Sequence, residues 1–123
     1  MIRSAVLVAL LVPMLPSGAL AADAAAGEKV FARCKICHTV QAGGPNTVGP
    51  NLHGVFGRKA GGTDGFSYSA AMKDSGITWD DQTTAKYLRD PRGTIPGNKM
   101  AFPGIKNDEE MANLLAYLHQ ATQ

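Results

Sequence analysis

The stretch Cys34-Lys35-Ile36-Cys37-His38 places two thiols and an imidazole within five residues. Residues three apart share one face of a helical turn, so both thiols can reach one edge of a flat ring. Each thiol can form a thioether with one of two neighbouring vinyl groups, and His38 follows beneath the ring with a nitrogen able to bind iron. This order of residues is the attachment pattern of a c-type haem. The stretch therefore predicts one covalent haem c, joined through Cys34 and Cys37.

Three other kinds of site use cysteines at this spacing. A structural zinc site needs four ligands, but the chain has only two cysteines, and His53 and His119 lie in unrelated contexts. A thioredoxin-like pair accompanies a strand–helix–strand pattern, which the sequence does not show. A structural disulfide is the simplest alternative, because an exported chain can oxidise its thiols. The histidine that directly follows the second cysteine favours haem attachment over all three.

The chain of 123 residues is long enough for one domain with a small core. Its beginning differs from the rest, with a short positive start, an apolar run over residues 5–15 and small residues behind it. This pattern is typical of a secretory signal peptide, and the apolar run is too short for a membrane span. We expect a cleaved signal peptide at residues 1–22 and an exported, periplasmic domain at residues 23–123.

The charge of the expected mature protein is close to neutral. Removal of Arg3 with the signal peptide leaves 11 basic against 10 acidic residues, which lowers the formal net charge from +2 to +1. The sequence contains no block of like charge, so it gives no reason to expect a nucleic-acid partner.

Helix-start and helix-stop signals predict an all-α chain of four helices joined by loops, with no segment that alternates like a strand. The last helix is amphipathic, because Met111, Leu114, Leu115 and Leu118 repeat at helical spacing. Glycine and proline punctuate loops at residues 39–65 and 92–102. The predicted helices begin after Asp23, after Ser67 or Ser69, at Thr78 to Asp81 and after Asn107, and end near Arg33, Ser75, Arg89 and Gln120.

Five stretches in this order resemble the class I c-type cytochromes. The chain is most similar to the bacterial cytochrome c2 subgroup, which is similar to mitochondrial cytochrome c. The resemblance covers about the whole of the expected mature chain. It implies the cytochrome c fold, a small helical shell around one haem, with crossing N- and C-terminal helices that meet near Gly27. The matching stretches are 34–40 (CKICHTV), 49–58 (GPNLHGVFGR), 65–68 (GFSY), 76–79 (GITW) and 95–102 (IPGNKMAF).

The predicted iron ligands are His38 and a second side chain. The candidates for the second are a methionine or one of the two histidines outside the motif, His53 and His119, which we interpret as surface or loop residues. A ligating histidine usually donates its other ring N–H to a fixed acceptor, and the resemblance implies that the carbonyl of Pro50 is this acceptor. Met111 lies on the amphipathic helix and Met72 in a short helix, where packing explains both. Met100 lies in a loop bounded by proline and glycine, and the resemblance agrees, so we assign it as the second ligand.

The resemblance also implies a polar surrounding for the haem. Buried propionates need partners, and the residues implied for them are Arg58, Tyr68, Trp79 and Asn98. Tyr87 is implied near the Met100 sulfur. Asn98 stands where the family often has threonine, and Met72 stands where mitochondrial relatives carry an asparagine in a buried water network. Because a thioether donates no hydrogen bond, we expect that network to be altered or absent.

These ligands predict a one-electron carrier and no enzyme activity, since they fill both iron coordination positions that a substrate could otherwise occupy. The resemblance implies a soluble periplasmic protein that carries electrons from a quinol-oxidising cytochrome bc complex to a terminal oxidase or a photosynthetic reaction centre. The alternative is a haem enzyme, a peroxidase or nitrite-handling protein, which needs a labile sixth ligand.

The expected partners are membrane redox complexes that dock transiently at the exposed haem edge. We hypothesise that a local basic rim steers acidic partners, in a salt-dependent way. The residues of this rim are Arg33, Lys35, Lys99 and Lys106. We expect a monomer with no small-molecule substrate.

Overall fold

The computed structural model describes residue 13 and residues 21–123. The predicted signal peptide lies almost entirely outside these residues. The described part is all-α, as predicted, and contains no strand, only an isolated bridge between Lys59 and Thr78. None of its helices has the length and apolar content that crossing a membrane requires. The helices are α1 (Ala24–Phe31), α2 (Ala70–Lys73), α3 (Asp81–Arg89), α4 (Pro91–Thr94) and α5 (Asp108–Ala121).

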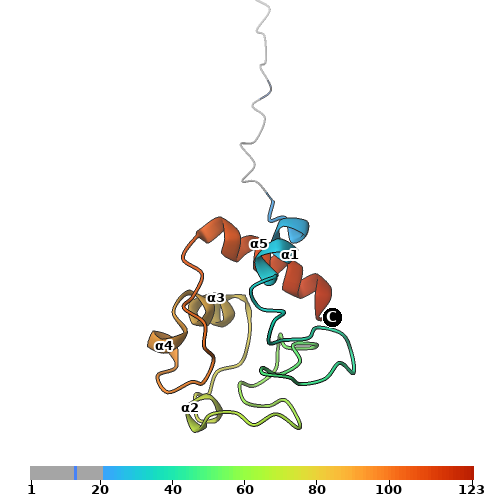
Figure 1. Cartoon of the computed structure of the whole chain (residues 1–123). Helices are drawn as coiled ribbons and strands as arrows, with labels where there is room; N and C mark the ends of the chain where they lie inside the picture. Colours follow the sequence, from blue (N-terminus) through green and yellow to red (C-terminus); the bar gives the residue numbers. More distant parts are fainter. Residues whose placement is uncertain (1–12, 14–20) are drawn as a thin grey trace, which may run out of the picture.

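The first and last helices, α1 and α5, pack across each other (Figure 1). Gly27 permits the close approach, because a Cβ built there would lie 1.9 Å from the Asn113 carbonyl oxygen. Beside this contact the rings of Phe31 and Tyr117 lie 5.2 Å apart between centroids. The predicted crossing and the role of Gly27 are therefore confirmed.

The apolar face of α5 forms the centre of the core. Leu114 is fully buried, and Met111 and Leu118 lie beside it in one cluster with residues of α1 and the segment before α5. The 3.6-residue period of the sequence thus predicts the buried face correctly. This core holds the helix crossing against the segment that carries Cys34.

Side-chain caps determine where the helices begin. Each cap accepts a backbone N–H that the first helical turn leaves without a partner. The side chain of Asp80 accepts from the N–H of Thr83, whose hydroxyl accepts from the N–H of Asp80 in return. The other predicted caps also accept from the helices they precede; they are Asp23, Ser69 and Asn107.

The short helix α4 corrects one prediction. Pro91 ends α3 as expected, but the chain then forms another helical turn where the sequence predicts a loop. Proline is favoured at the first helical position because its missing N–H has no partner there in any case. The carboxylate of Asp90 accepts from the N–H of Gly93 and completes the start of the turn.

The long glycine-rich loop is ordered by hydrogen bonds from side chains to the backbone. Asn51 is buried, and its amide donates to the carbonyls of Gln41 and Gly44 at 2.8 and 2.9 Å. Its oxygen accepts from the N–H of His53 at 2.6 Å. These bonds satisfy backbone N–H and C=O groups that a strand would pair with its neighbour. The loop is therefore ordered and covers one side of the molecule (Figure 1).

Candidate functional site

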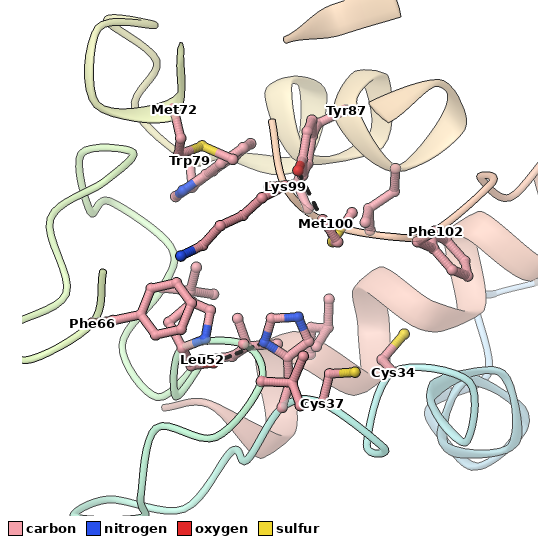
Figure 2. Close-up of a pocket in the computed structure, with 18 of the residues that line it drawn as sticks. Cys34, Cys37, Leu52, Phe66, Met72, Trp79, Tyr87, Lys99, Met100 and Phe102 are labelled. Atoms are coloured by element: carbon pink, nitrogen blue, oxygen red, sulfur yellow. Dashed lines mark hydrogen bonds between the residues drawn. The ribbon is translucent and has the colours of Figure 1, made fainter. Parts of the chain in front are cut away.

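A cavity of about 260 Å³ lies between the helix crossing, α3 and the long loops. Its walls are mostly apolar, with Leu52, Phe66 and Phe102 among them (Figure 2). The sulfur atoms of Cys34 and Cys37 enter it from one wall, and those of Met100 and Met72 lie in other parts of the lining (Figure 2). The cavity therefore collects the groups that the sequence singles out.

The two cysteines occupy one helical turn after α1. The N–H groups of Cys37 and His38 both donate to the carbonyl of Cys34 at 3.0 Å, so the motif is helical as its spacing predicts. Both thiols are free and both line the cavity. Burial raises the pKa of the Cys34 thiol to about 11, and the Arg33 guanidinium opposes the shift. This thiol is therefore protonated near neutral pH.

The ring of His38 is fixed from two sides. Its Nδ1 atom lies 2.8 Å from the carbonyl oxygen of Pro50, and a Cβ built on Gly49 would lie 2.5 Å from the ring. Only glycine leaves room for the imidazole at this position. Burial lowers the pKa of His38, and the hydrogen bond to Pro50 opposes the shift. A neutral ring that donates from Nδ1 keeps Nε2 as a free donor for a metal.

Met100 faces the cavity beside the hydroxyl of Tyr87. The distance from this hydroxyl to the Met100 sulfur is 3.9 Å, a long contact in which the hydroxyl donates (Figure 2). Tyr87 is buried, and burial raises its pKa to about 12. The hydroxyl therefore keeps its proton, and can donate to sulfur, across the physiological pH range.

Asn98 is not among the residues that line the cavity. Its amide donates to the carbonyls of Pro91 and Ile95, both at 2.9 Å. Its oxygen accepts from the N–H of Met100 at 2.9 Å. Because all three bonds go to the backbone, the side chain fixes the loop that presents Met100.

The polar end of the cavity contains Arg58, Tyr68 and Trp79. The guanidinium of Arg58 donates to the carbonyls of Asn51 and His53 and to the hydroxyl of Thr63. The N–H of Thr63 donates to the Tyr68 hydroxyl at 3.2 Å. These contacts hold a cation and a hydroxyl at the edge of an otherwise apolar space.

Two lining residues have features that the sequence analysis did not use. Thr84 is buried on α3, and its hydroxyl oxygen has no hydrogen-bond partner among the residues that the structure describes. The sequence signal that could have placed Thr84 at the cavity is its position one helical turn before Tyr87. The side chain of Lys99 extends along the cavity (Figure 2), and its ammonium group donates to the carbonyl of Ser67. It also lies 4.9 Å from the centroid of the Phe66 ring.

The four residues of the hypothesised basic rim are all exposed. Arg33 pairs with Glu110 at 2.8 Å. The ammonium group of Lys106 bonds to the carbonyl of Arg89, which itself pairs with Asp108 at 2.7 Å. Within the described residues, Arg33 is thus the one member of the four that forms an ion pair, and the basic rim stays a hypothesis.

The donor set fits a haem c. Two free thiols can form thioethers, while an imidazole nitrogen and a thioether sulfur can bind iron from different walls. The apolar lining suits a porphyrin ring, and the polar end suits its carboxylates. Within residues 21–123, no group of three or more His, Cys, Asp or Glu side chains could hold a metal ion, and neither cysteine is in a disulfide. The zinc and disulfide alternatives thus gain no support from the described chain.

Comparison with known families gives a direct match. The model of the cytochrome c family matches residues 24–122. The chain is 49% identical over 102 residues to cytochrome c2 of Blastochloris viridis, covering 83% of this chain and 80% of the relative. It is also 49% identical over 103 residues to cytochrome c of Nigella damascena, covering 83% and 93%.

A solved structure shows the same fold. Cytochrome cH from Methylobacterium extorquens is similar with a TM-score of 0.75 and 49% sequence identity. The match covers 80% of this chain and 98% of that one.

Proposed function

Since this chain belongs to the cytochrome c family, we propose that it is a soluble periplasmic carrier of single electrons. It takes electrons from a quinol-oxidising cytochrome bc complex and delivers them to a terminal oxidase or a photosynthetic reaction centre. The cofactor is one covalent haem c. The observation that carries the proposal is the meeting of two free thiols, an imidazole and a thioether in one apolar cavity.

His38 and Met100 are the proposed iron ligands. Bound haem supplies an iron centre that gains and loses one electron. The Pro50 carbonyl holds the Nδ1 proton of His38, which orients the ring and leaves Nε2 as the donor atom. The neutral sulfur of Met100 is a soft ligand that favours the reduced state.

The remaining lining residues have two proposed tasks. The apolar walls keep water away, so added positive charge on oxidation is poorly stabilised, which favours the reduced state. Arg58 and Tyr68, with Trp79 nearby, supply a cation and polar groups for the carboxylates of the cofactor. The hydrogen bonds of Arg58 to the loop backbone support this assignment, because they hold the guanidinium in place.

The central test is the optical and redox behaviour of the purified protein. We expect a pyridine assay to detect covalent haem, a mass that includes one haem, and a redox titration that follows a single one-electron step. An apoprotein mass with free thiols, from cells that attach haem to other proteins, would contradict the proposal.

A variant at the proposed sixth ligand separates a carrier from a haem enzyme. Met100→Ala should abolish the weak red absorption band of Met–Fe(III) ligation. Met72→Leu is the matched control, since it removes another cavity-lining thioether and should keep the band. If Met100→Ala leaves the band intact, the ligand assignment is wrong.

Export is tested separately, by N-terminal sequencing of the protein from a periplasmic fraction. We expect the mature chain to begin at Ala22 or Asp23. A mature protein that retains residues 1–22 would contradict the proposed cleavage while leaving the electron-carrier function in place.

A further inference from the structure

The peptide group between Pro50 and Asn51 is held at both of its ends. Its carbonyl oxygen, on Pro50, lies 2.8 Å from the Nδ1 atom of His38. Its N–H, on Asn51, donates to the Oδ1 atom of Asn46 at 2.8 Å. Because the peptide group is planar and rigid, it links the proposed iron ligand directly to the side chain of Asn46.

The side chain of Asn46 is fixed in turn by the opposite loop. Its Nδ2 atom donates to the carbonyl of Asp64 at 3.1 Å, 18 residues further along the chain. The amide nitrogen thus faces a carbonyl and the amide oxygen faces an N–H, so only this orientation of the amide satisfies both bonds. The Oδ1 atom is therefore held at the Asn51 N–H.

The three hydrogen bonds run in one direction from His38 to Asp64. The Nδ1–H of His38 donates to the Pro50 carbonyl, the N–H of the same peptide donates to Asn46, and the Asn46 amide donates onward. We call these three bonds the relay. Amide groups joined in series polarise one another and strengthen each bond by about 10–30%. The relay therefore makes the Pro50 oxygen a stronger acceptor than an isolated carbonyl.

A stronger acceptor draws the Nδ1 proton further from the ring of His38. Hydrogen-bond partners of this kind raise the basicity of a ligating histidine. The ring then donates more electron density from Nε2, which favours oxidised over reduced iron. The relay should therefore act on the redox balance without touching the cofactor.

We propose that Asn46 is a positioning residue for electron transfer, which acts on His38 through the peptide group between them. This inference rests on the proposed electron-carrier function. It makes Asn46 a determinant of the balance between oxidised and reduced protein, and loss of the relay should favour the reduced state.

The first test is Asn46→Leu in the holoprotein, followed by redox titration and by NMR of the reduced protein. Leucine has nearly the same shape but neither donates nor accepts. We expect the ratio of reduced to oxidised protein at a fixed ambient potential to rise by about threefold, since only a fraction of one hydrogen bond is lost. The NMR signal of the His38 Nδ1 proton should move upfield, as it does when a hydrogen bond weakens.

Asn46→Asp separates the relay from a plain tie between loops. Near neutral pH its carboxylate still accepts from the Asn51 N–H, now with a full negative charge, but cannot donate to the Asp64 carbonyl. Charge-assisted hydrogen bonds are stronger, so the His38 signal should move downfield and the reduced-to-oxidised ratio should fall. If Asn46 only ties the loops, both variants lose the tie and change the signal alike, which would overturn the proposal.

Thr39→Val is the control for a loosened loop. The Thr39 hydroxyl donates to the Pro45 carbonyl at 2.8 Å, so this change removes a similar loop bond but no bond of the relay. We expect the ratio and the His38 signal to stay at their wild-type values. An effect as large as that of Asn46→Leu would overturn the proposal.

The same measurements separate the relay from the carrier function. If the wild type shows no one-electron couple, the proposed function itself is wrong. If the couple is present and neither Asn46 variant moves the His38 signal, only the relay is contradicted. Should Asn46→Leu fail to fold, Asn46→Asp decides: a downfield shift supports the relay, and an unchanged or upfield signal overturns it.

Discussion

The hydroxyl of Tyr87 lies 3.9 Å from the sulfur of Met100, the proposed iron ligand. A hydrogen bond to sulfur withdraws electron density from it. Tyr87→Phe removes the bond and makes the thioether a better donor to oxidised iron. We expect the reduction potential to fall by tens of millivolts, because a weak hydrogen bond is worth about 0.5–1 kcal/mol. A redox titration measures the shift, and an unchanged or raised potential would contradict this role.

The same residue makes stability depend on alkaline pH. Burial raises the pKa of Tyr87 to about 12, above the ordinary value of about 10 in an unfolded chain. Its contribution to stability is therefore complete below about pH 10 and is lost as pH rises towards 12. Over this range the wild type should lose about 3 kcal/mol of unfolding free energy relative to Tyr87→Phe, so any advantage that it has at neutral pH is reversed. Urea denaturation at several pH values measures it; a constant difference would show that the tyrosine is not buried in solution.

Thr84 carries a buried hydroxyl that has no hydrogen-bond partner within the described part of the chain. An unsatisfied buried hydroxyl costs about 1–3 kcal/mol, and valine has nearly the same shape without it. We expect Thr84→Val to stabilise the holoprotein by about 1 kcal/mol in urea denaturation. Thr84→Ser is the control; it keeps the hydroxyl, loses a methyl group and should destabilise. If Thr84→Val destabilises, the hydroxyl has a partner in the holoprotein.

Among the elements, the crossing of α1 and α5 depends on a single missing side chain. Gly27→Ala would place a methyl group 1.9 Å from the Asn113 carbonyl oxygen, so the helices must separate. We expect the free energy of unfolding to fall by about 1–3 kcal/mol, the usual cost of overpacking. Glu28→Ala, an exposed change in the same helix, should cost far less. Equal effects of the two variants in urea denaturation would show that the helices do not approach so closely.

Local sequence signals predict the elements well where the structure uses local contacts. Asp80 and Asn107 cap their helices because the capping bonds reach only three residues along the chain. The sequence does not predict α4, because Pro91 both follows the end of α3 and begins α4. A proline after a helix is read as a helix end, although it is also favoured at the first position of a helix.

The site residues also differ in how far local sequence predicts their positions. The attachment turn is local, so its spacing predicts the placement of both thiols. The position of Asn98 is different, since its partners Pro91 and Ile95 depend on how the whole loop turns back. Family resemblance implies a polar side chain here but does not indicate where a substituted amide points.

For the molecule as a whole, the cavity sets the stability of the chain without its cofactor. Without a cofactor, the mostly apolar side chains that line this space stay unpacked, and Phe31, Leu114 and Leu118 of the core cluster are among them. A small domain is stabilised by only about 5–15 kcal/mol, so the loss of this packing is large by comparison. We therefore expect the protein made without haem attachment to lack a cooperative thermal transition by circular dichroism. A cooperative transition like that of the holoprotein would contradict this expectation.

The three hydrogen bonds of the Asn98 amide have a kinetic consequence. A loop tied to one side chain at three points should keep the Met100 sulfur nearly still when the proposed haem iron changes oxidation state. Few nuclei then rearrange when an electron arrives, so the reorganisation energy is small and tunnelling can be fast even when the driving force is slight. The same stiffness should slow the binding of other ligands such as cyanide. The rate of cyanide binding would therefore measure how often the loop that carries Met100 opens.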